Sequence, residues 1–412
     1  MIGMNKRNIF LWILYDFANS IGIIAFFLYL SQWLVIEGGL SSFWFNSIFV
    51  GSTILLLLSA PLLATISDRI QKRKIFLNIM TVGTFVFFTA TALVARLGTD
   101  YAWLVAIFYL LAQYFYQFSF VFYNPMLEQL APLEKRGKIS GLGQMVNWIG
   151  QMVGILIALP LASSGRLTPL LPTTLIFFAL ALPMMIFFKE EKPEEKIKAS
   201  IKEAKGEIRT SASRFYAFIR YSPAGFFLIA FFFFNDAILT LTNNFPIYLE
   251  KVFAVGDASK SIGLLSILIM TAFGAYASGW LADKIGMKKT LKIVLISWIV
   301  VIPAMALAGS FSFFMIIAVP MGILYGSIGS VTRAYLSGIL PKGQMNYGFS
   351  FYTLMERFAT FAGPLTWGLI VSSFGESSII GYRIAAFSMT IFVIIGYFFI
   401  RKIPEYNKVI SE

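Results

Sequence analysis

The sequence predicts an all-α polytopic membrane protein, with twelve transmembrane helices in two pseudo-symmetric six-helix bundles and both termini in the cytoplasm. Three observations support this prediction: the apolar composition, the distribution of Lys and Arg, and an internal repeat. The chain has 412 residues, of which 58% are hydrophobic and 13% are charged. A soluble domain carries about 25% charged residues, so this composition is typical of a chain that crosses a membrane several times.

Twelve apolar runs are long enough to span a bilayer, which takes about 20 predominantly apolar residues in a helix. They cover residues 9–35, 44–66, 75–95, 102–126, 139–162, 170–188, 223–249, 261–281, 290–309, 312–335, 347–371 and 381–400. The first run is not a good signal peptide, because it is too long, contains Asp16 and is followed by further spans. We therefore expect it to remain in the membrane as the first helix.

Lys and Arg are unevenly distributed over the segments between these runs. With the N-terminus inside the cell, the alternation of spans places 26 of the 33 basic residues in inner segments and 4 in outer loops. This bias follows the positive-inside rule and predicts cytoplasmic termini. The formal net charge of +13 is then explained by membrane topology, and we do not expect nucleic acid as a partner.

One long polar segment divides the twelve runs into six and six. Its second part carries Phe215 and Phe218 among arginines, a pattern that suits an amphipathic helix on the inner membrane surface. We expect a N-terminal six-helix bundle over 1–188, a cytoplasmic linker with this partly amphipathic helix over 189–222, a C-terminal six-helix bundle over 223–401 and a cytoplasmic tail over 402–412.

Two loops share one pattern of small, acidic and basic residues. Between runs 2 and 3 the chain reads ATISDRIQKRK, residues 64–74, and between runs 8 and 9 it reads GWLADKIGMKK, residues 279–289. Asp16 in run 1 and Asp236 in run 7 form a further pair in the same order. Landmarks that recur in matching spans indicate two parallel halves, an architecture with the substrate site between the halves near the bilayer midplane and alternating access by rocking.

The twelve runs and the paired loops resemble the major facilitator superfamily of membrane transporters. GWLADKIGMKK is close to that family's loop signature, whereas ATISDRIQKRK has Ala64 and Gln71 where glycines are usual. Within the superfamily, LYDFANS (residues 14–20) and FYNPMLEQLAPLEKRGKISGLG (residues 122–143) resemble the group related to the vacuolar autophagy-related amino-acid effluxer. The resemblance implies the major facilitator fold and movement of a small solute, with amino acids as the expected substrates and export as the expected direction.

The repeated loops predict a latch at the inner ends of runs 2 and 8. An acid followed by basic residues can hold the two halves together on the inner side and release them when they rock. We expect the latch to comprise Asp68, Arg69, Arg73, Gly279, Asp283, Lys284, Gly286, Lys288 and Arg333, with Asp283 and Arg333 as an ion pair. The alternative is that the motif serves topology and turn chemistry alone, with Gly286 ending a helix.

Three carboxylates lie inside the apolar runs: Asp16, Asp236 and Glu356. Ionisable groups at such depth are costly unless they are paired or hydrated, so they usually face a cavity and carry function. Because the chain has no histidine, these carboxylates are the candidate proton carriers. The alternatives are an interfacial cap for Asp16 and a hydrogen bond across a helix pair for Asp236. Arg357 diverges from Glu356 by about 100° on a helix, so we expect each of the two to need another partner.

Polar side chains recur at helical spacing in runs 4, 5 and 11, which predicts that these faces point into the bundles. Together with the carboxylates they form the expected substrate and proton cavity: Asp16, Asn19, Gln113, Gln117, Asn147, Gln151, Asp236, Tyr352 and Glu356. The alternative is that the polar groups join helices through hydrogen bonds. Five glycines at helical spacing, Gly150, Gly154, Gly322, Gly326 and Gly329, indicate close helix packing.

A secondary active transporter, coupled to protons, accounts best for these features. A drug, lipid or amphipath exporter on the same fold is the alternative, followed by a membrane-embedded enzyme or a receptor. Cysteine and histidine are absent, as is a Gly-x-x-x-x-Gly-Lys motif, so we expect no cofactor, no metal site, no direct use of ATP and no enzymatic activity. The expected partners are the lipid bilayer, a small-molecule substrate and protons, with the chain acting as a monomer in the plasma membrane.

Overall fold

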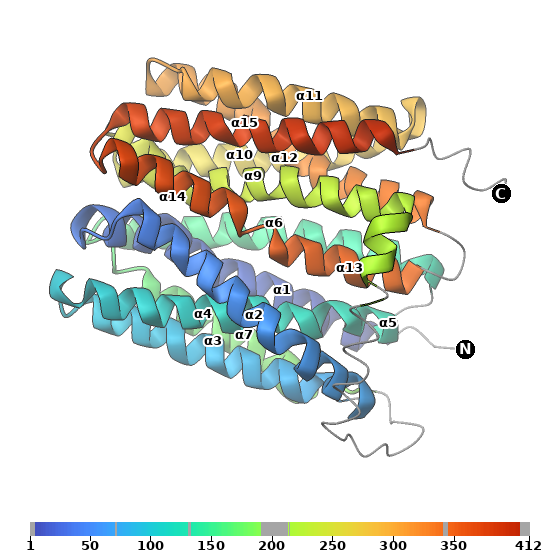
Figure 1. The fold of residues 1–412 in the computed structure, drawn as a ribbon. Coiled ribbons are helices and arrows are strands. Elements are labelled where there is room, and N and C mark those ends of the chain that lie inside the picture. The colour runs from blue at the N-terminus through green and yellow to red at the C-terminus, as the bar shows by residue number, and fades with distance from the viewer. Residues whose placement is uncertain are drawn as a thin grey trace. The chain divides into compact units, whose positions relative to one another are not determined.

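A computed structural model describes residues 5–70, 72–130, 133–190, 213, 215–340 and 345–403 of the chain. These residues are almost entirely helical, and their contacts divide the chain into two compact units (Figure 1). The first unit comprises Met1–Leu40 and Gly51–Ser211, and the second comprises Ser41–Val50 and Ala212–Glu412. Most of the predicted linker and the C-terminal tail lie outside the described residues, so the predicted domain boundaries stay predictions.

The helices of the first unit follow the first six apolar runs. α1 (Lys6–Ala25) continues through two short π-helical segments, Phe26–Leu30 and Trp33–Glu37. The other helices are α2 (Ser42–Ile70), α3 (Arg73–Ala95), α4 (Ala102–Tyr123), α5 (Leu127–Leu130), α6 (Leu133–Ala162) and α7 (Leu170–Phe187). Short 3-10 turns at Thr99–Tyr101 and Asn124–Met126 precede and follow α4.

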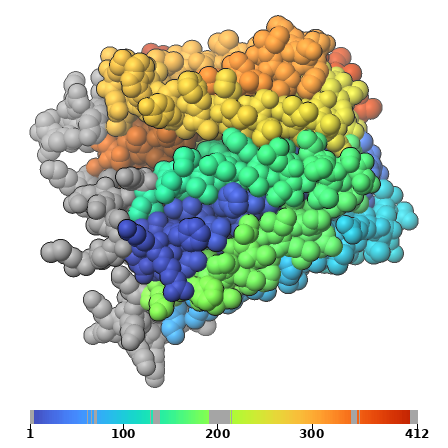
Figure 2. Space-filling model, turned by 180° about the vertical axis from the view of Figure 1, so that it is seen from behind, coloured from blue at the N-terminus to red at the C-terminus, as the bar shows by residue number. Residues whose placement is uncertain are grey.

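α1 is the central helix of the first unit. It packs against both α6 and α7, and Figure 2 shows it (dark blue) between them (blue-green and light green). The predicted close packing at Gly150 and Gly154 is confirmed: a Cβ on Gly150 would lie 2.9 Å from the Phe17 carbonyl oxygen, and one on Gly154 would lie 3.1 Å from the Cα of Ile21. Two small residues on α6 therefore allow the two helix backbones to approach closely.

The second unit contains the helices of the last six apolar runs. They are α9 (Pro223–Phe253), α10 (Asp257–Ile285), α11 (Met287–Ala306), α12 (Phe311–Ile339), α13 (Met345–Phe358), α14 (Ala362–Phe374) and α15 (Ile379–Lys402). α9 packs along α15, and α10 packs along α12. On the face shown in Figure 2, α10 (yellow) lies beside the orange helices α11 and α12.

The first residues of α2 belong to the second unit by their contacts. Glu376 accepts hydrogen bonds from the backbone N–H of Ser42 at 3.0 Å and from its hydroxyl at 2.7 Å, which caps the start of α2. One turn later, Asn46 and Asn244 exchange two side-chain hydrogen bonds of 3.0 and 2.9 Å, and both residues are buried.

Within the described part of the chain, eleven helices are long and apolar enough to cross a membrane. The predicted span over 347–371 is not one continuous helix, which corrects the sequence-based expectation. It is divided into α13 and α14, and the break at Ala359–Phe361 is visible in Figure 1. Pro364 accounts for the break, because proline lacks an N–H and disfavours the helical conformation of the residue before it, yet fits the first turn of a new helix.

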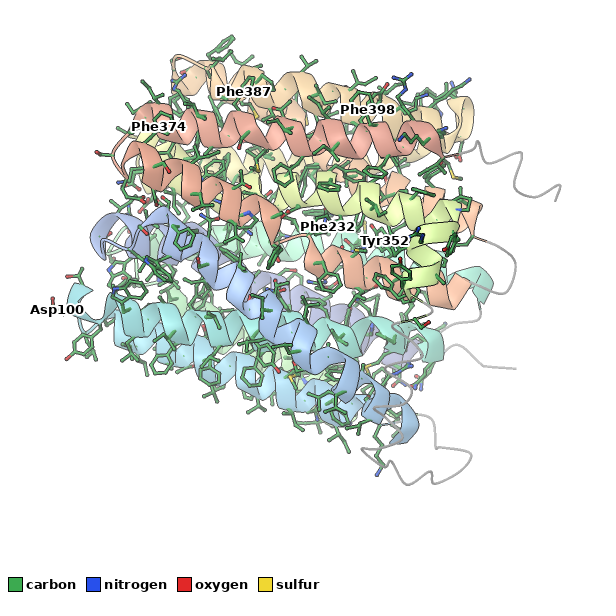
Figure 3. All side chains as sticks on the ribbon, viewed as in Figure 1. Asp100, Phe232, Tyr352, Phe374, Phe387 and Phe398 are labelled. Atoms are coloured by element: carbon green, nitrogen blue, oxygen red, sulfur yellow. The ribbon has the colours of Figure 1, made fainter. Side chains whose placement is uncertain are left out.

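Large apolar side chains cover the outer faces of these helices (Figure 3). Phe387 and Phe398 on α15 are 47% and 52% exposed, and Trp103 on α4 is 54% exposed. Exposed apolar surface of this extent is unusual for a soluble monomer and is expected for helices that face lipid.

Candidate functional site

Asp16 is hydrogen-bonded to another residue of the predicted site. It is buried on α1 and its Oδ1 accepts a hydrogen bond of 2.9 Å from the side-chain amide of Asn147 on α6. The amide of Gln151, one turn further along α6, donates to Asn147 Oδ1 at 2.9 Å. The structure thus joins three predicted site residues in one chain of hydrogen bonds within the first unit.

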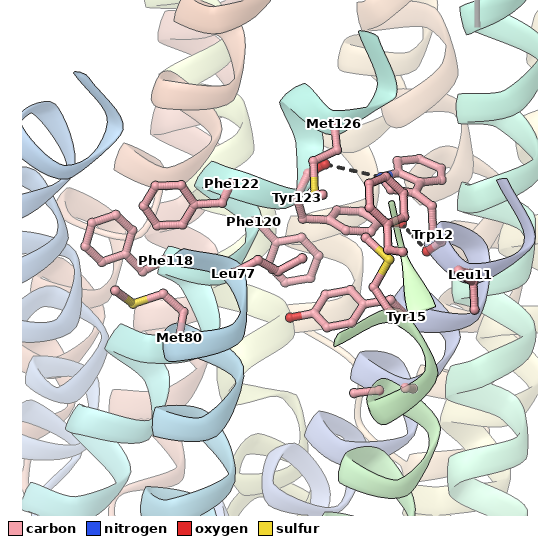
Figure 4. Packing of buried hydrophobic residues seen from close by; sticks show 14 of the residues in the cluster. Leu11, Trp12, Tyr15, Leu77, Met80, Phe118, Phe120, Phe122, Tyr123 and Met126 are labelled. Atoms are coloured by element: carbon pink, nitrogen blue, oxygen red, sulfur yellow. Dashed lines mark hydrogen bonds between the residues drawn. The ribbon is translucent and has the colours of Figure 1, made fainter. Parts of the chain in front are cut away.

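Aromatic residues form a wall against the first turns of α1 (Figure 4). The rings of Trp12 and Tyr123 stack with centroids 4.6 Å apart, and each residue bonds the other's backbone carbonyl, at 3.2 Å from Trp12 Nε1 and 2.9 Å from the Tyr123 hydroxyl. A Cβ on Gly143 would lie 2.8 Å from the Trp12 ring and 3.9 Å from Asp16 Oδ2. This rigid wall fixes the first turns of α1, and with them the position of Asp16.

Three other predicted residues of the first unit contact a neighbouring helix or their own helix. Gln117 on α4 donates to the Ser52 hydroxyl on α2 at 3.1 Å. Asn19 donates to the backbone carbonyl of Tyr15 at 2.8 Å, and Gln113 lies close to the Tyr109 hydroxyl. All three amides are buried. These contacts fit the alternative that such side chains join helices or bond their own backbone.

Asp236 is fully buried on α9 and faces the break between α13 and α14. Its Oδ2 accepts a hydrogen bond of 2.7 Å from the backbone N–H of Gly363, and the N–H groups of Phe361 and Ala362 also act on the carboxylate. These are the groups at the N-terminus of α14, which have no partner within that helix and carry a partial positive charge. Asp236 therefore caps a half-helix from a distance of 127 residues along the chain.

Thr240 and Gly363 complete this arrangement, and sequence reasoning did not select either of them. A Cβ on Gly363 would overlap the Thr240 hydroxyl oxygen and lie 3.0 Å from Asp236 Oδ1, so a side chain at this position would displace both groups. The signal in the sequence was the Gly363–Pro364 pair inside an apolar run, which marks a possible helix interruption.

Tyr352, Glu356 and their neighbours form a second polar group on α13. The Tyr352 hydroxyl, labelled in Figure 3, is 3.0 Å from Thr332 Oγ1, and both Glu356 and Arg333 act electrostatically on it. Arg357 Nη2 lies 3.8 Å from Glu356 Oε2, and the expectation that each of the two needs another partner stays a prediction. Both side chains are partly exposed, so this long contact is weak.

In the second unit, the loop motif covers the end of α10, the turn at Gly286 and the start of α11. Gly286 ends α10 with φ of 92°, a conformation that favours glycine. Asp283 is exposed, and Lys284 Nζ lies 3.7 Å from the centre of the Trp280 ring. Nothing lies within 4 Å of a Cβ built on Gly279. In the first unit, the side chains of Asp68 and Arg69 lie outside the described residues, so the latch stays a prediction.

The basic residues that end each motif bind helix termini inside their own unit. Arg73 donates to the Pro125 carbonyl at 3.0 Å, and its neighbour Lys74 donates to the Ile186 and Phe188 carbonyls, at 3.0 and 2.7 Å, where α7 ends. Lys288 does the same where α15 ends, donating to the Ile403 carbonyl. A cation at a helix C-terminus satisfies free carbonyls and interacts favourably with the helix dipole.

The sequence model of the Major Facilitator Superfamily matches residues 10–297 and 258–412. The chain belongs to the Major Facilitator Superfamily. Its fold supports the same assignment, because the chain superposes with a TM-score of 0.73 on a bacterial homologue of the human lysosomal transporter Spinster, covering 99% of each chain at 14% identity. It superposes at 0.72 on a D-xylose–proton symporter, covering 98% of this chain and 99% of that one at 14% identity.

Two groups of relatives share sequence with the chain. An uncharacterised MFS-type transporter of Bacillus subtilis, YxiO, is 24% identical over 96% of this chain and 94% of its own length. Autophagy-related protein 22 of Pichia angusta is 24% identical over 35% of this chain and 28% of its own length. The match to the autophagy-related proteins is therefore confined to about a third of either protein.

In the part of the chain that the structure describes, no cluster of three or more His, Cys, Asp or Glu could hold a metal ion. The two carboxylates can accept hydrogen bonds and can bind a cationic group or a proton.

Proposed function

We propose that the chain is a secondary active transporter that moves small polar solutes, with amino acids as the first substrate class, by alternating access coupled to protons. The observation that carries the proposal is a buried carboxylate at the same place in each repeat, Asp16 on α1 and Asp236 on α9. Asp236 forms no ion pair with Lys or Arg among the described residues that would explain its burial as a structural salt bridge.

The physical argument is that a charge inside the membrane is expensive to keep. A carboxylate at this depth can bind a ligand in the transport cycle, and the ammonium group of an amino acid or a proton are the simplest ligands for it. Two similar proteins support these choices: a D-xylose–proton symporter shares the fold, and autophagy-related protein 22, whose group the sequence motifs resemble, matches about a third of the chain.

The remaining features of the proposal are the ones expected from the sequence. The transporter acts in the plasma membrane as a monomer, exports its substrate, and uses no cofactor and no catalysis. Glu356 and Tyr352 on α13 are the proposed polar contacts in the second unit, and Asn147 and Gln151 on α6 are those in the first.

The test uses purified protein in liposomes. Counterflow of labelled neutral amino acids is followed with and without an imposed pH gradient, for the wild type, Asp236→Asn and Glu356→Gln. We expect counterflow by the wild type and loss of the stimulation by the pH gradient in one of the variants. The matched control is Glu250→Gln, a carboxylate of the same helix that bonds Lys260 at 2.6 Å near the end of α9.

Absence of counterflow for every amino acid, with protein shown to be folded, would contradict the substrate class. Peptides, drugs and lipids would then be tested on the same preparation. Counterflow that no pH gradient stimulates would contradict the proton coupling and leave the substrate class standing.

A further inference from the structure

The predicted linker ends in a short helix over residues 215–221, called here the linker helix. Ser222 follows it, and the Ser222 hydroxyl accepts a hydrogen bond of 2.9 Å from the Gly225 N–H, which caps the start of α9. A Cβ on Gly225 would overlap the Phe218 carbonyl oxygen and lie 2.6 Å from the Cα of Ile219. Because this glycine has no side chain, the linker helix packs against the first turn of α9 and turns sharply away from its axis (Figure 1).

One face of the linker helix is used inside the second unit. The centroids of the Phe215 and Phe218 rings lie 4.6 and 5.3 Å from that of the Phe351 ring on α13, and Phe218 is buried. These two are the aromatic residues whose position among arginines predicts a helix on the membrane surface. Since they pack on α13, contact with the membrane is left to the opposite face of the helix.

That opposite face, formed by Tyr216, Ala217, Arg220 and Tyr221, is exposed, with Tyr216 60% and Tyr221 75% exposed. The Arg220 Cζ lies 6.0 and 5.7 Å from the centres of the two tyrosine rings, and its Nη1 donates to the Tyr216 hydroxyl at 2.9 Å. Arg220 forms no ion pair with a carboxylate among the described residues. Two tyrosine rings thus hold an exposed guanidinium group, which has further N–H donors to bind an anion.

Chain connectivity places this exposed face at the membrane surface. Tyr221 is two residues before Pro223, where the spanning helix α9 begins, and Phe226 in the first turn of α9 is already 39% exposed. Tyrosine and arginine are typical of the boundary between lipid and water, because their apolar parts contact lipid while their polar ends reach the headgroups.

Basic side chains predominate at the end of the second unit where α9 begins. α15 runs antiparallel to α9, since a Cβ on Gly396 would lie 3.0 Å from the Ala230 carbonyl oxygen, so α15 ends beside the start of α9. Lys288 donates to the Ile403 carbonyl, which brings the start of α11 to the same end. The charged side chains of these helix ends and of the end of α10 are Asp283, Lys284, Lys288, Lys289, Arg401 and Lys402. Their net positive charge attracts anionic lipid.

We propose that the exposed face of the linker helix binds anionic phospholipid headgroups at the membrane surface, with Arg220 as the phosphate-binding residue. The planar guanidinium group can donate two hydrogen bonds to one phosphate, and the hydroxyls of Tyr216 and Tyr221 can donate to neighbouring oxygen atoms. A zwitterionic headgroup offers the same phosphate without net charge, so the basic surroundings favour the anionic lipid. This inference goes beyond the proposed function and does not depend on the transported solute.

The test uses the absence of cysteine from the chain. Ala217→Cys places one thiol on the exposed face for an environment-sensitive dye, and the full-length protein is reconstituted without substrate into phosphatidylcholine liposomes with increasing phosphatidylglycerol. We expect the dye emission to shift to shorter wavelength as the anionic lipid increases. Arg220→Gln requires about five times more phosphatidylglycerol for half of the shift, the equivalent of one basic residue at an anionic surface. Arg401→Gln, the matched control, removes the same charge from the end of α15 and keeps the midpoint.

Equal midpoints for Arg220→Gln and the protein that keeps Arg220, at equal melting temperatures, would overturn the proposal. A full shift in phosphatidylcholine alone would also overturn it, because it would show insertion without recognition of the headgroup. Emission that stays at long wavelength in every lipid would place this face in water, as for a surface that binds a protein, and is equally incompatible. In the protein that keeps Arg220, concentrated NaCl weakens the shift because salt screens exposed charges, and a shift that salt leaves unchanged contradicts the proposal without any variant at Arg220.

Discussion

The amide that donates to Asp16 belongs to a helix face that can be predicted from the sequence. Asn147 and Gln151 are four residues apart on α6, and this spacing places both amides on one helix face. The structure adds that this face meets α1 at the level of Asp16, with a 2.9 Å bond from Asn147. The role of this group in substrate binding is a proposal, whereas its role in holding α1 against α6 follows directly from the contacts.

Replacing Asn147 by leucine tests that second role. The change removes a donor from Asp16 and an acceptor from Gln151, so we expect the free energy of unfolding to fall by about 1–3 kcal/mol, the range for loss of one hydrogen bond to a charged group and one between neutral groups. Thermal unfolding of purified protein in lipid gives the measurement. Gln144→Leu, one turn earlier on α6, is the control, and an equal effect of both substitutions would show that the bond to Asp16 contributes nothing.

Helix packing in the second unit depends on single glycines, and they are not equivalent. A Cβ on Gly326 of α12 would overlap the Thr271 carbonyl oxygen and lie 2.8 Å from the Ala275 backbone nitrogen on α10. A Cβ on Gly322 of the same helix would overlap the Ile267 carbonyl oxygen. The prediction of close packing is confirmed for these two residues. It is wrong for Gly329, where no atom of the described residues lies within 4 Å of an added Cβ. Sequence spacing alone cannot separate them, because it does not show where the partner helix diverges.

This difference gives a prediction for α12. We expect Gly326→Ala to lower the free energy of unfolding by about 1–3 kcal/mol, because the added methyl group forces α10 and α12 apart. Gly329→Ala has room for the methyl group and gains helix propensity, so it is neutral or stabilises by up to about 1 kcal/mol. Melting temperatures of the two variants in the same detergent decide the matter, and a destabilisation by Gly329→Ala as large as that by Gly326→Ala would refute this account.

The division of the last but one span into α13 and α14 shows what a hydropathy pattern cannot predict. Apolar residues continue across the break, so the run over 347–371 has the length and composition of one span. The Gly363–Pro364 pair marks the interruption, but the group that satisfies the exposed N-terminus of α14 is Asp236, which comes from another helix. Only the tertiary structure shows that the Asp236 carboxylate contacts the N-terminus of α14.

Across the whole molecule, the repeat found in the sequence predicts which helices correspond, and the structure shows how the two copies differ. Lys74 and Lys288 have the same task in both units, since each binds the carbonyls that end its neighbouring helix. The two carboxylates do not have the same task. Asp16 accepts a hydrogen bond from an amide side chain on α6. Asp236 accepts one from the backbone of a broken helix, and its second oxygen has no hydrogen-bond partner among the described residues.

This asymmetry predicts different transport phenotypes for the two repeats, on the basis of the proposed function. Asp16→Asn keeps a polar side chain that Asn147 can bond, so we expect it to lower counterflow and uptake driven by a pH gradient by the same factor. Asp236→Asn mimics the protonated carboxyl group permanently, so we expect counterflow to persist while the pH gradient no longer stimulates uptake. The ratio of gradient-driven uptake to counterflow, measured in the same liposomes, separates the two. If Asp16→Asn lowers this ratio as much as Asp236→Asn does, the proton is shared by both repeats and the broken helix does not distinguish them.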